Sequence, residues 1–163
     1  WIIASKRNIE TLSNFSSFGM GGVSHPSQLY AAALFEPSRA AKQRNAIEAH
    51  YNWQRQRYGE AFEKMGLKVF TGNGGFYHLM LLPEWLNCDE LNRRLYKRGA
   101  AILAGRDCDM GRPHSKDPAY TSPYMDMFRF SFGPLLPETF DDDIKLMTEV
   151  LDEYKADVAG GKA

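Results

Sequence analysis

Three phenylalanines at alternate positions in the stretch MDMFRFSFGP, residues 125–134, constrain the fold more than any other feature of the sequence. Successive side chains of a strand point to opposite faces of its sheet. Two sets of side chains follow, one on each face: Phe128, Phe130 and Phe132, and Met127, Arg129 and Ser131. The pattern predicts a strand with one aromatic face turned to the core. It turns Arg129 to the other face, where the guanidinium points either into water or toward an anion.

The remainder of the chain predicts helices and strands in a definite order, from apolar periodicity and from turn residues. In chain order we expect a strand over residues 1–5, a short helix and glycine-rich turn within 7–22, a compact helix after Ser24, a long helix from Ser38 to Met65, a hairpin over 67–83, a short helix over 87–99, a strand over 100–105, a long loop over 107–124, a strand over 125–132 and a helix from Thr139 onward. This order predicts an α+β fold, a mixed sheet covered by helices.

Cap and turn residues support these boundaries. The expected N-caps are Ser24, Ser38, Asn87 or Asp89, and Thr139 with Asp142 in capping-box-like spacing. Gly66 is expected to end the long helix, because glycine adopts the left-handed conformation of a helix C-terminus without strain. The Asn73–Gly74 pair is expected to make the hairpin turn for the same conformational reason.

Length, charge and cysteine content limit the classes of protein. The 163 residues, of which 44% are hydrophobic, suit one ordinary globular domain with a packed core. Twenty basic and twenty acidic residues give a formal net charge of zero, so no overall field favours nucleic acid or an anionic membrane. The two cysteines and four scattered histidines lack the spacing of a zinc site or a disulfide framework. We therefore expect no metal, no membrane span and a cytoplasmic location.

Five stretches stand out for their order along the chain: WIIAS, VSHPSQLYAAALFE, GLKVFTGNGGFYHLMLLP, RGAAILAG and MFRFSFGPLLPETFDDDIKLM. In this order they resemble the C-terminal part of the fold-type I, pyridoxal-phosphate-dependent aminotransferases of the class I/II group. The resemblance covers nearly the whole chain. It implies that residues 1–37 are a remnant of the large cofactor domain, and that residues 38–163 are the small C-terminal domain that clamps the substrate.

The resemblance also implies roles for three residues. It assigns Arg129 to the substrate α-carboxylate, and a guanidinium suits this task because its planar fork of donors grips a carboxylate with two hydrogen bonds. It places His25 and Ser27 near the active site of a partner subunit. The complete enzyme is expected to be a homodimer that uses pyridoxal 5'-phosphate to move an amino group between an amino acid and a 2-oxo acid.

The Schiff-base lysine of this family is the most important departure. The resemblance places that lysine before Trp1, so we expect an upstream portion of the protein and no catalytic residue among these 163. Lys6 lies on the wrong side of Trp1 to replace it. These residues alone are expected to be inactive, with no covalently bound cofactor.

A second departure lies in ILAGRDCDMGR, residues 102–112, where related enzymes often have a Pro-Gly turn and an aromatic residue near the substrate. Gly105 is kept, and the residues after it are charged. Two interpretations stay open: Arg106 and Arg112 select an anionic substrate side chain, or they pair with Asp107 and Asp109.

Two other functions remain as alternatives. A lyase of the aminocyclopropane-carboxylate synthase type shares this fold and the carboxylate-binding arginine. A non-catalytic interaction module would lack the cofactor half altogether. Product analysis separates the two enzymes, and the presence of an upstream lysine-bearing domain separates both from the module.

Overall fold

The computed structural model describes residues 2–112 and 115–161, and it divides into two compact units, Trp1–Ile47 and Glu48–Ala163. The boundary falls inside the long helix α3, Pro37–Lys64, which begins in the first unit and ends in the second.

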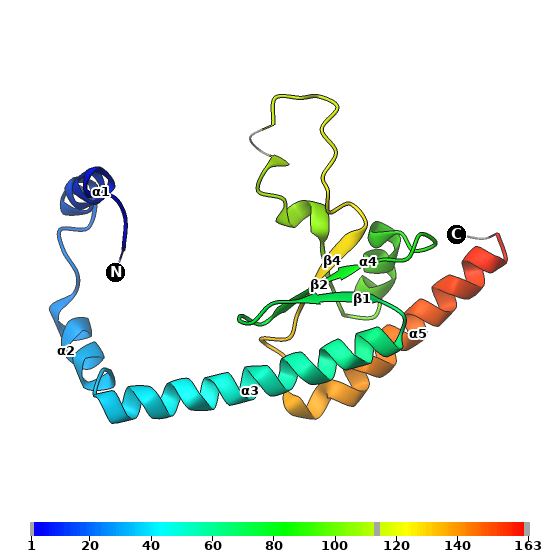
Figure 1. Cartoon of the computed structure of the whole chain (residues 1–163), viewed down its shortest axis with the longest axis horizontal. Helices are drawn as coiled ribbons and strands as arrows, with labels where there is room; N and C mark the ends of the chain where they lie inside the picture. Colours follow the sequence, from blue (N-terminus) through cyan, green and yellow to red (C-terminus); the bar gives the residue numbers. More distant parts are fainter. Residues whose placement is uncertain (1, 113–114, 162–163) are drawn as a thin grey trace. The chain divides into compact units, whose positions relative to one another are not determined.

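The N-terminal unit consists of helices: α1, Lys6–Gly19, α2, His25–Leu34, and the beginning of α3 (Figure 1). The strand expected over residues 1–5 is wrong for the described residues 2–5, which have no regular structure. Ile2 and Ile3 are 62% and 85% exposed, and no described strand pairs with them. A β-rich sequence becomes a strand only where a neighbouring strand accepts its hydrogen bonds.

Ser24 occupies the N-cap position of α2 as predicted, although its side chain makes no cap hydrogen bond. The predicted cap of α3 is wrong. At the start of α3, the carboxylate of Glu36 takes the place expected for Ser38, and it accepts hydrogen bonds from the backbone N–H groups of Ser38 (3.1 Å) and Arg39 (2.9 Å). A carboxylate at a helix N-terminus satisfies free donors and also faces the positive end of the helix dipole.

The C-terminal unit is built on a four-stranded sheet in the order β1-β2-β4-β3 (Figure 1). Its strands are β1, Lys68–Thr71, β2, Tyr77–Leu81, β3, Leu103–Ala104, and β4, Met127–Ser131. All three pairings are antiparallel. The predicted hairpin is confirmed as β1 and β2, and the predicted closing strand is confirmed as β4. The predicted turn conformation at Asn73–Gly74 is wrong, because neither residue has a positive φ and the left-handed residue of the turn is Gly75, with a φ of 71°.

Helices cover the aromatic face of this sheet. These helices are the second half of α3, together with α4 (Cys88–Tyr96) and α5 (Phe140–Ala159). The unit also contains the short 3-10 turns η1 (Gly105–Cys108) and η3 (Pro137–Thr139). Phe128 and Phe132 are fully buried, and the Phe130 ring lies 4.8 Å from that of Phe62 on α3. The predicted alternation along β4 is therefore confirmed, and so is the α+β fold class.

Two of the remaining predicted caps are confirmed, and one is wrong. Gly66 ends α3 with a φ of 82°, and the Asn87 side chain accepts hydrogen bonds from two N–H groups at the start of α4, both as predicted. The capping box at Thr139 is wrong, because its hydroxyl bonds the Asp143 carboxylate (3.0 Å) instead of a backbone N–H group. None of the described helices is long and apolar enough to cross a bilayer.

Candidate functional site

The face of the sheet opposite the phenylalanines carries the candidate site. Strand register and alternation place nine side chains on this face, which we call the open face: Lys68, Phe70, Tyr77, Leu79, Leu81, Leu103, Met127, Arg129 and Ser131. None of the nine is buried, whereas the alternating positions His78, Met80, Phe128 and Ala104 are buried. The helices of this unit therefore leave the open face uncovered.

Arg129 lies at the centre of the open face. It is paired in register with Leu79 of β2 on one side and with Leu103 of β3 on the other. Its guanidinium carbon lies 4.3 Å from the centre of the Tyr77 ring, a cation–π contact. Within residues 2–112 and 115–161, the Arg129 guanidinium forms no ion pair with a carboxylate. The described part of the chain thus holds this cation in place without neutralising it.

Aromatic packing fixes the end of the hairpin beside Arg129. The rings of Phe76 and Tyr77 are 4.6 Å apart, and Phe76 also lies 5.7 Å from the Tyr51 ring of α3. The Phe132 N–H group donates to the Phe76 carbonyl (3.0 Å), which ties the hairpin to the end of β4. Tyr77 is therefore anchored on the same strand pair that carries Arg129. Tyr77 carries no motif of its own in the sequence, and the available signal is strand alternation from the hairpin turn, which places it on this face.

The two arginines after β3, Arg106 and Arg112, form ion pairs with carboxylates. Arg106 grips Asp89 with two hydrogen bonds of 2.9 and 2.5 Å, and these bonds lower the pKa of the Asp89 carboxyl below its usual value. Arg112 lies 3.6 Å from Asp107, and Arg106 lies 4.0 Å from the same carboxylate. The interpretation that these arginines form local ion pairs is confirmed for Asp107.

The same interpretation is wrong for Asp109. This carboxylate accepts hydrogen bonds from the Tyr120 hydroxyl (2.7 Å) and the Gly111 N–H group (2.9 Å), and it is 8% exposed. Hydrogen bonds from Ser122 and then Tyr120 lower the pKa of its carboxyl. Asp109 therefore ties together two ends of the predicted loop instead of pairing with an arginine.

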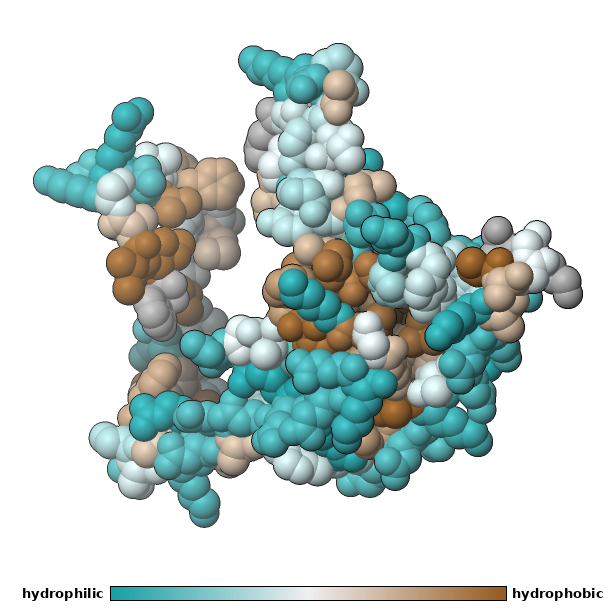
Figure 2. Space-filling view, turned by 45° about the vertical axis from the view of Figure 1, so that its right-hand side comes forward, coloured by the Kyte–Doolittle hydropathy of each residue, from teal (hydrophilic) through white to brown (hydrophobic). Residues whose placement is uncertain are grey.

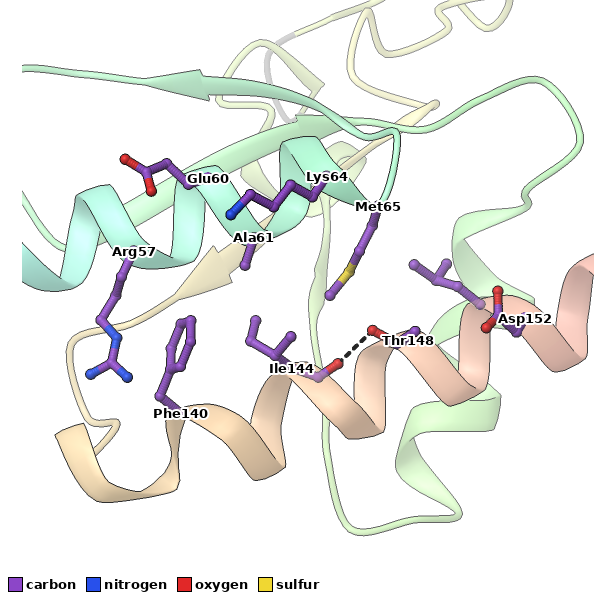
Figure 3. A pocket seen from close by; sticks show the side chains of 10 residues that line it. Arg57, Glu60, Ala61, Lys64, Met65, Phe140, Ile144, Thr148 and Asp152 are labelled. Carbon is purple, nitrogen blue, oxygen red and sulfur yellow. Dashed lines mark hydrogen bonds between the residues drawn. The ribbon is translucent and has the colours of Figure 1, made fainter.

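Two of the hollows in the C-terminal unit have Arg129 or Arg57 in their walls. One, of about 550 Å³, is lined mainly by apolar residues of the 99–103 segment, β4 and α5, and Arg129 contributes to its wall. The other, of about 670 Å³, lies between α3 and α5, where Arg57 points down between the helices (Figure 3). The guanidinium carbon of Arg57 lies 4.2 Å from the Trp53 ring and 3.7 Å from the Phe140 ring, so this arginine serves packing between the helices.

The N-terminal unit carries the other predicted site residues. His25 and Ser27 lie in the first turn of α2, and both are exposed. Lys6 opens α1 with a side chain that is 92% exposed, and its ammonium lies 3.9 Å from the Glu10 carboxylate. A lysine that forms a Schiff base needs burial or a neighbouring cation to become nucleophilic. Lys6 is exposed and lies beside a carboxylate, so it does not fit the covalent anchor of pyridoxal phosphate.

The family described as aminotransferase class I and II matches residues 1–120 of this chain. The chain belongs to the class I and II aminotransferase family. Arg129 lies beyond the matched residues, so its role depends on the fold and on the geometry of the open face. No curated protein matches the sequence.

Solved structures share the fold over nearly the whole chain. A Pyrococcus protein designated A1 matches 90% of this chain with a TM-score of 0.74 and 19% identity. The α-aminoadipate aminotransferase of Thermus thermophilus, solved in complex with N-(5'-phosphopyridoxyl)-L-leucine, matches 94% with a TM-score of 0.72 and 16% identity. The valine-pyruvate aminotransferase of Salmonella typhimurium matches 94% with a TM-score of 0.74 and 14% identity.

The chain is much shorter than these proteins. It covers 35%, 38% and 40% of their respective lengths. The likeness at such low identity shows a shared fold, that of part of an aminotransferase.

Proposed function

We propose that this chain is the C-terminal part of a pyridoxal-phosphate-dependent aminotransferase, acting on an amino acid and a 2-oxo acid, and that Arg129 binds the substrate α-carboxylate. The observation that carries the proposal is the position of Arg129: a half-buried cation on the open face, held against Tyr77 and left unpaired by the described carboxylates. Such an arrangement suits a ligand that brings its own negative charge. A bidentate contact also fixes the orientation of that ligand.

Pyridoxal phosphate, bound by the portion of the enzyme that carries the Schiff-base lysine, would supply the electron sink for the reaction. The residues described above would contribute binding and orientation. Residues 38–163 form the substrate-clamping domain in this proposal, and residues 1–37 belong to the cofactor domain. His25 and Ser27, exposed at the start of α2, lie at the interface of a homodimer.

The test is Arg129→Lys in the full-length protein expressed from its own gene. Lysine keeps the charge but loses the planar fork, so kcat/KM for the amino acid substrate should fall about 10- to 100-fold, the value of a lost charge-assisted hydrogen bond. Arg112→Lys is the matched control, because Arg112 is paired with Asp107 and lies off the open face. Equal kinetics for Arg129→Lys and the unmodified enzyme would remove Arg129 from this role.

A second measurement tests whether the covalent anchor of the cofactor lies outside these 163 residues. The 163-residue chain mixed with pyridoxal phosphate should give no stoichiometric adduct on reduction, measured by mass spectrometry. A single specific adduct on Lys6 would contradict the proposal.

A further inference from the structure

The open face is mostly apolar around its single central cation. Six of its nine side chains are apolar or aromatic: Phe70, Tyr77, Leu79, Leu81, Leu103 and Met127. Phe70, on the edge strand β1, and Tyr77, at the start of β2, are 43% and 40% exposed, so this face presents aromatic surface to its surroundings. Hydrophobic side chains gather in a patch on this unit, below the segment that projects from the sheet (Figure 2).

Register places apolar side chains directly beside Arg129. Phe70, Leu79 and Leu103 lie in the same cross-strand row as the arginine, with Leu79 and Leu103 as its immediate neighbours. Neighbouring strands are about 4.8 Å apart, so a molecule held at the guanidinium reaches Leu79 or Leu103 with its next few atoms. The surface that meets the rest of the ligand is therefore apolar.

Among the residues that the structure describes, a second carboxylate on the ligand would find no free cation next to this row. The two arginines that could have served, Arg106 and Arg112, are engaged by Asp89 and Asp107. Lys68 is the other cation of the open face. It lies on the outermost strand, two strands from β4, and its ammonium lies 5.3 Å from the Phe70 ring. A carboxylate brought against the Leu79 row would lose water without gaining a partner, which is strongly unfavourable.

The contact with Tyr77 explains how the arginine stays available. The guanidinium carbon lies over the ring at 4.3 Å. A cation–π contact uses no carboxylate or carbonyl acceptor, so the fork of N–H donors is left for a carboxylate. Tyr77 thus restrains the cation without competing for its donors.

We propose that the open face selects amino acids with an apolar side chain and no second carboxylate, and that Tyr77 is the positioning residue for Arg129, an inference that rests on the function proposed above. The ligand's α-carboxylate binds the guanidinium, and its side chain lies on the Leu79 and Leu103 row. Phenylalanine and leucine are the substrates of this class to test, and aspartate is the excluded one.

The first experiment compares amino donors with the full-length enzyme. The value of kcat/KM for phenylalanine should exceed that for aspartate by about 100-fold, because aspartate places an unpaired charge on an apolar surface. A preference for aspartate, or equal values, would overturn the assignment of substrate class. Loss of aspartate turnover in Lys68→Met would identify Lys68 as a partner for the second carboxylate, which would overturn it as well.

Binding without turnover gives an independent readout. Calorimetry should show that 3-phenylpropanoate binds the enzyme more tightly than succinate, with the difference preserved in Arg112→Lys. Tighter binding of succinate would contradict the proposal even if the kinetic comparison were limited by product release.

The role of Tyr77 is tested with paired variants and paired substrates. Tyr77→Leu removes the aromatic face and should lower kcat/KM for phenylalanine about 3-fold, mainly through KM, whereas Tyr77→Phe should restore it. The same Tyr77→Leu change should not alter the reaction with 2-phenylethylamine, which lacks the carboxylate. Equal losses for both substrates would show a structural defect and would overturn the positioning role.

The outcomes separate the two proposals. If Arg129→Lys weakens the reactions of phenylalanine and 2-phenylethylamine equally, the carboxylate role of Arg129 fails and the function proposed above falls with it. If Arg129→Lys weakens phenylalanine alone and aspartate is still preferred, the carboxylate role stands and only the substrate class is wrong.

Discussion

Substitution of Gly105 by alanine tests the packing that positions the start of β4. Gly105 is buried at the point where β3 passes into η1. A Cβ atom at this position would lie 2.8 Å from the Met127 carbonyl oxygen and closer still to the Tyr124 carbonyl oxygen. Both obstacles are backbone atoms, so relief requires a shift of the chain that enters β4 instead of a rotation of a side chain.

The expected cost follows from this geometry. Overpacking by one methyl group costs about 1–3 kcal/mol, and rigid backbone obstacles place Gly105→Ala near the upper end, at about 3 kcal/mol. For a unit the size of Glu48–Ala163, each kcal/mol lowers the melting temperature by roughly 4 °C. We therefore expect Gly105→Ala to lower the melting temperature of this unit by roughly 12 °C, measured by far-UV circular dichroism and checked by the urea midpoint.

Gly74→Ala is the matched control for this experiment. A Cβ at Gly74 would meet nothing within 4 Å, and its φ lies outside the left-handed region, so the free energy of unfolding should change by less than about 0.5 kcal/mol. The reasoning is refuted if Gly105→Ala and Gly74→Ala unfold at the same temperature. A shift at Met127 would also displace Arg129, two residues along β4. In the full-length enzyme, the lower melting temperature of Gly105→Ala should therefore appear together with a lower kcat/KM.

Three further predictions concern stability. Burial lowers the pKa of His78, so as the pH drops the unfolded state binds a proton before the folded state does. The free energy of unfolding should therefore fall as the pH drops below about 6.5. Urea midpoints at pH 7.5 and 5.0 should show this fall, and His78→Leu should remove it. Asn87→Ala removes a cap that accepts two backbone N–H bonds and should cost about 1 kcal/mol, whereas Asn87→Asp should cost little. Tyr58→Phe deletes the 2.7 Å bond to Asp143 and should cost about 1 kcal/mol, and no change in the urea midpoint would show that the bond contributes nothing net.

Local patterns predicted much of the C-terminal unit correctly. The hairpin, the Gly66 terminator and the Asn87 cap each depend on residues within a few positions of one another, and backbone conformation decides them. Alternation along 125–132 also gave the correct faces of β4. These features follow from short-range sterics and hydrogen bonds, which a sequence displays directly.

Predictions failed where the outcome depended on partners outside the local segment. A strand over residues 1–5 requires a neighbouring strand, and no described strand pairs with residues 2–5. At α3, both Glu36 and Ser38 carry oxygen atoms able to cap the helix, and the carboxylate takes the bonds. Thr139 likewise bonds the Asp143 side chain. At both helix starts the sequence held more than one plausible partner, and energies outside the local segment selected among them.

The sequence by itself determined that a cation stands opposite an aromatic face, since strand alternation permits no other placement of Arg129 relative to its neighbours. The tertiary structure alone decided that Tyr77, more than fifty positions away, lies under that cation. It also decided that Asp89 forms an ion pair with Arg106. Strand register and helix packing bring together residues that no local rule connects, because their contact energy depends on how the whole sheet pairs.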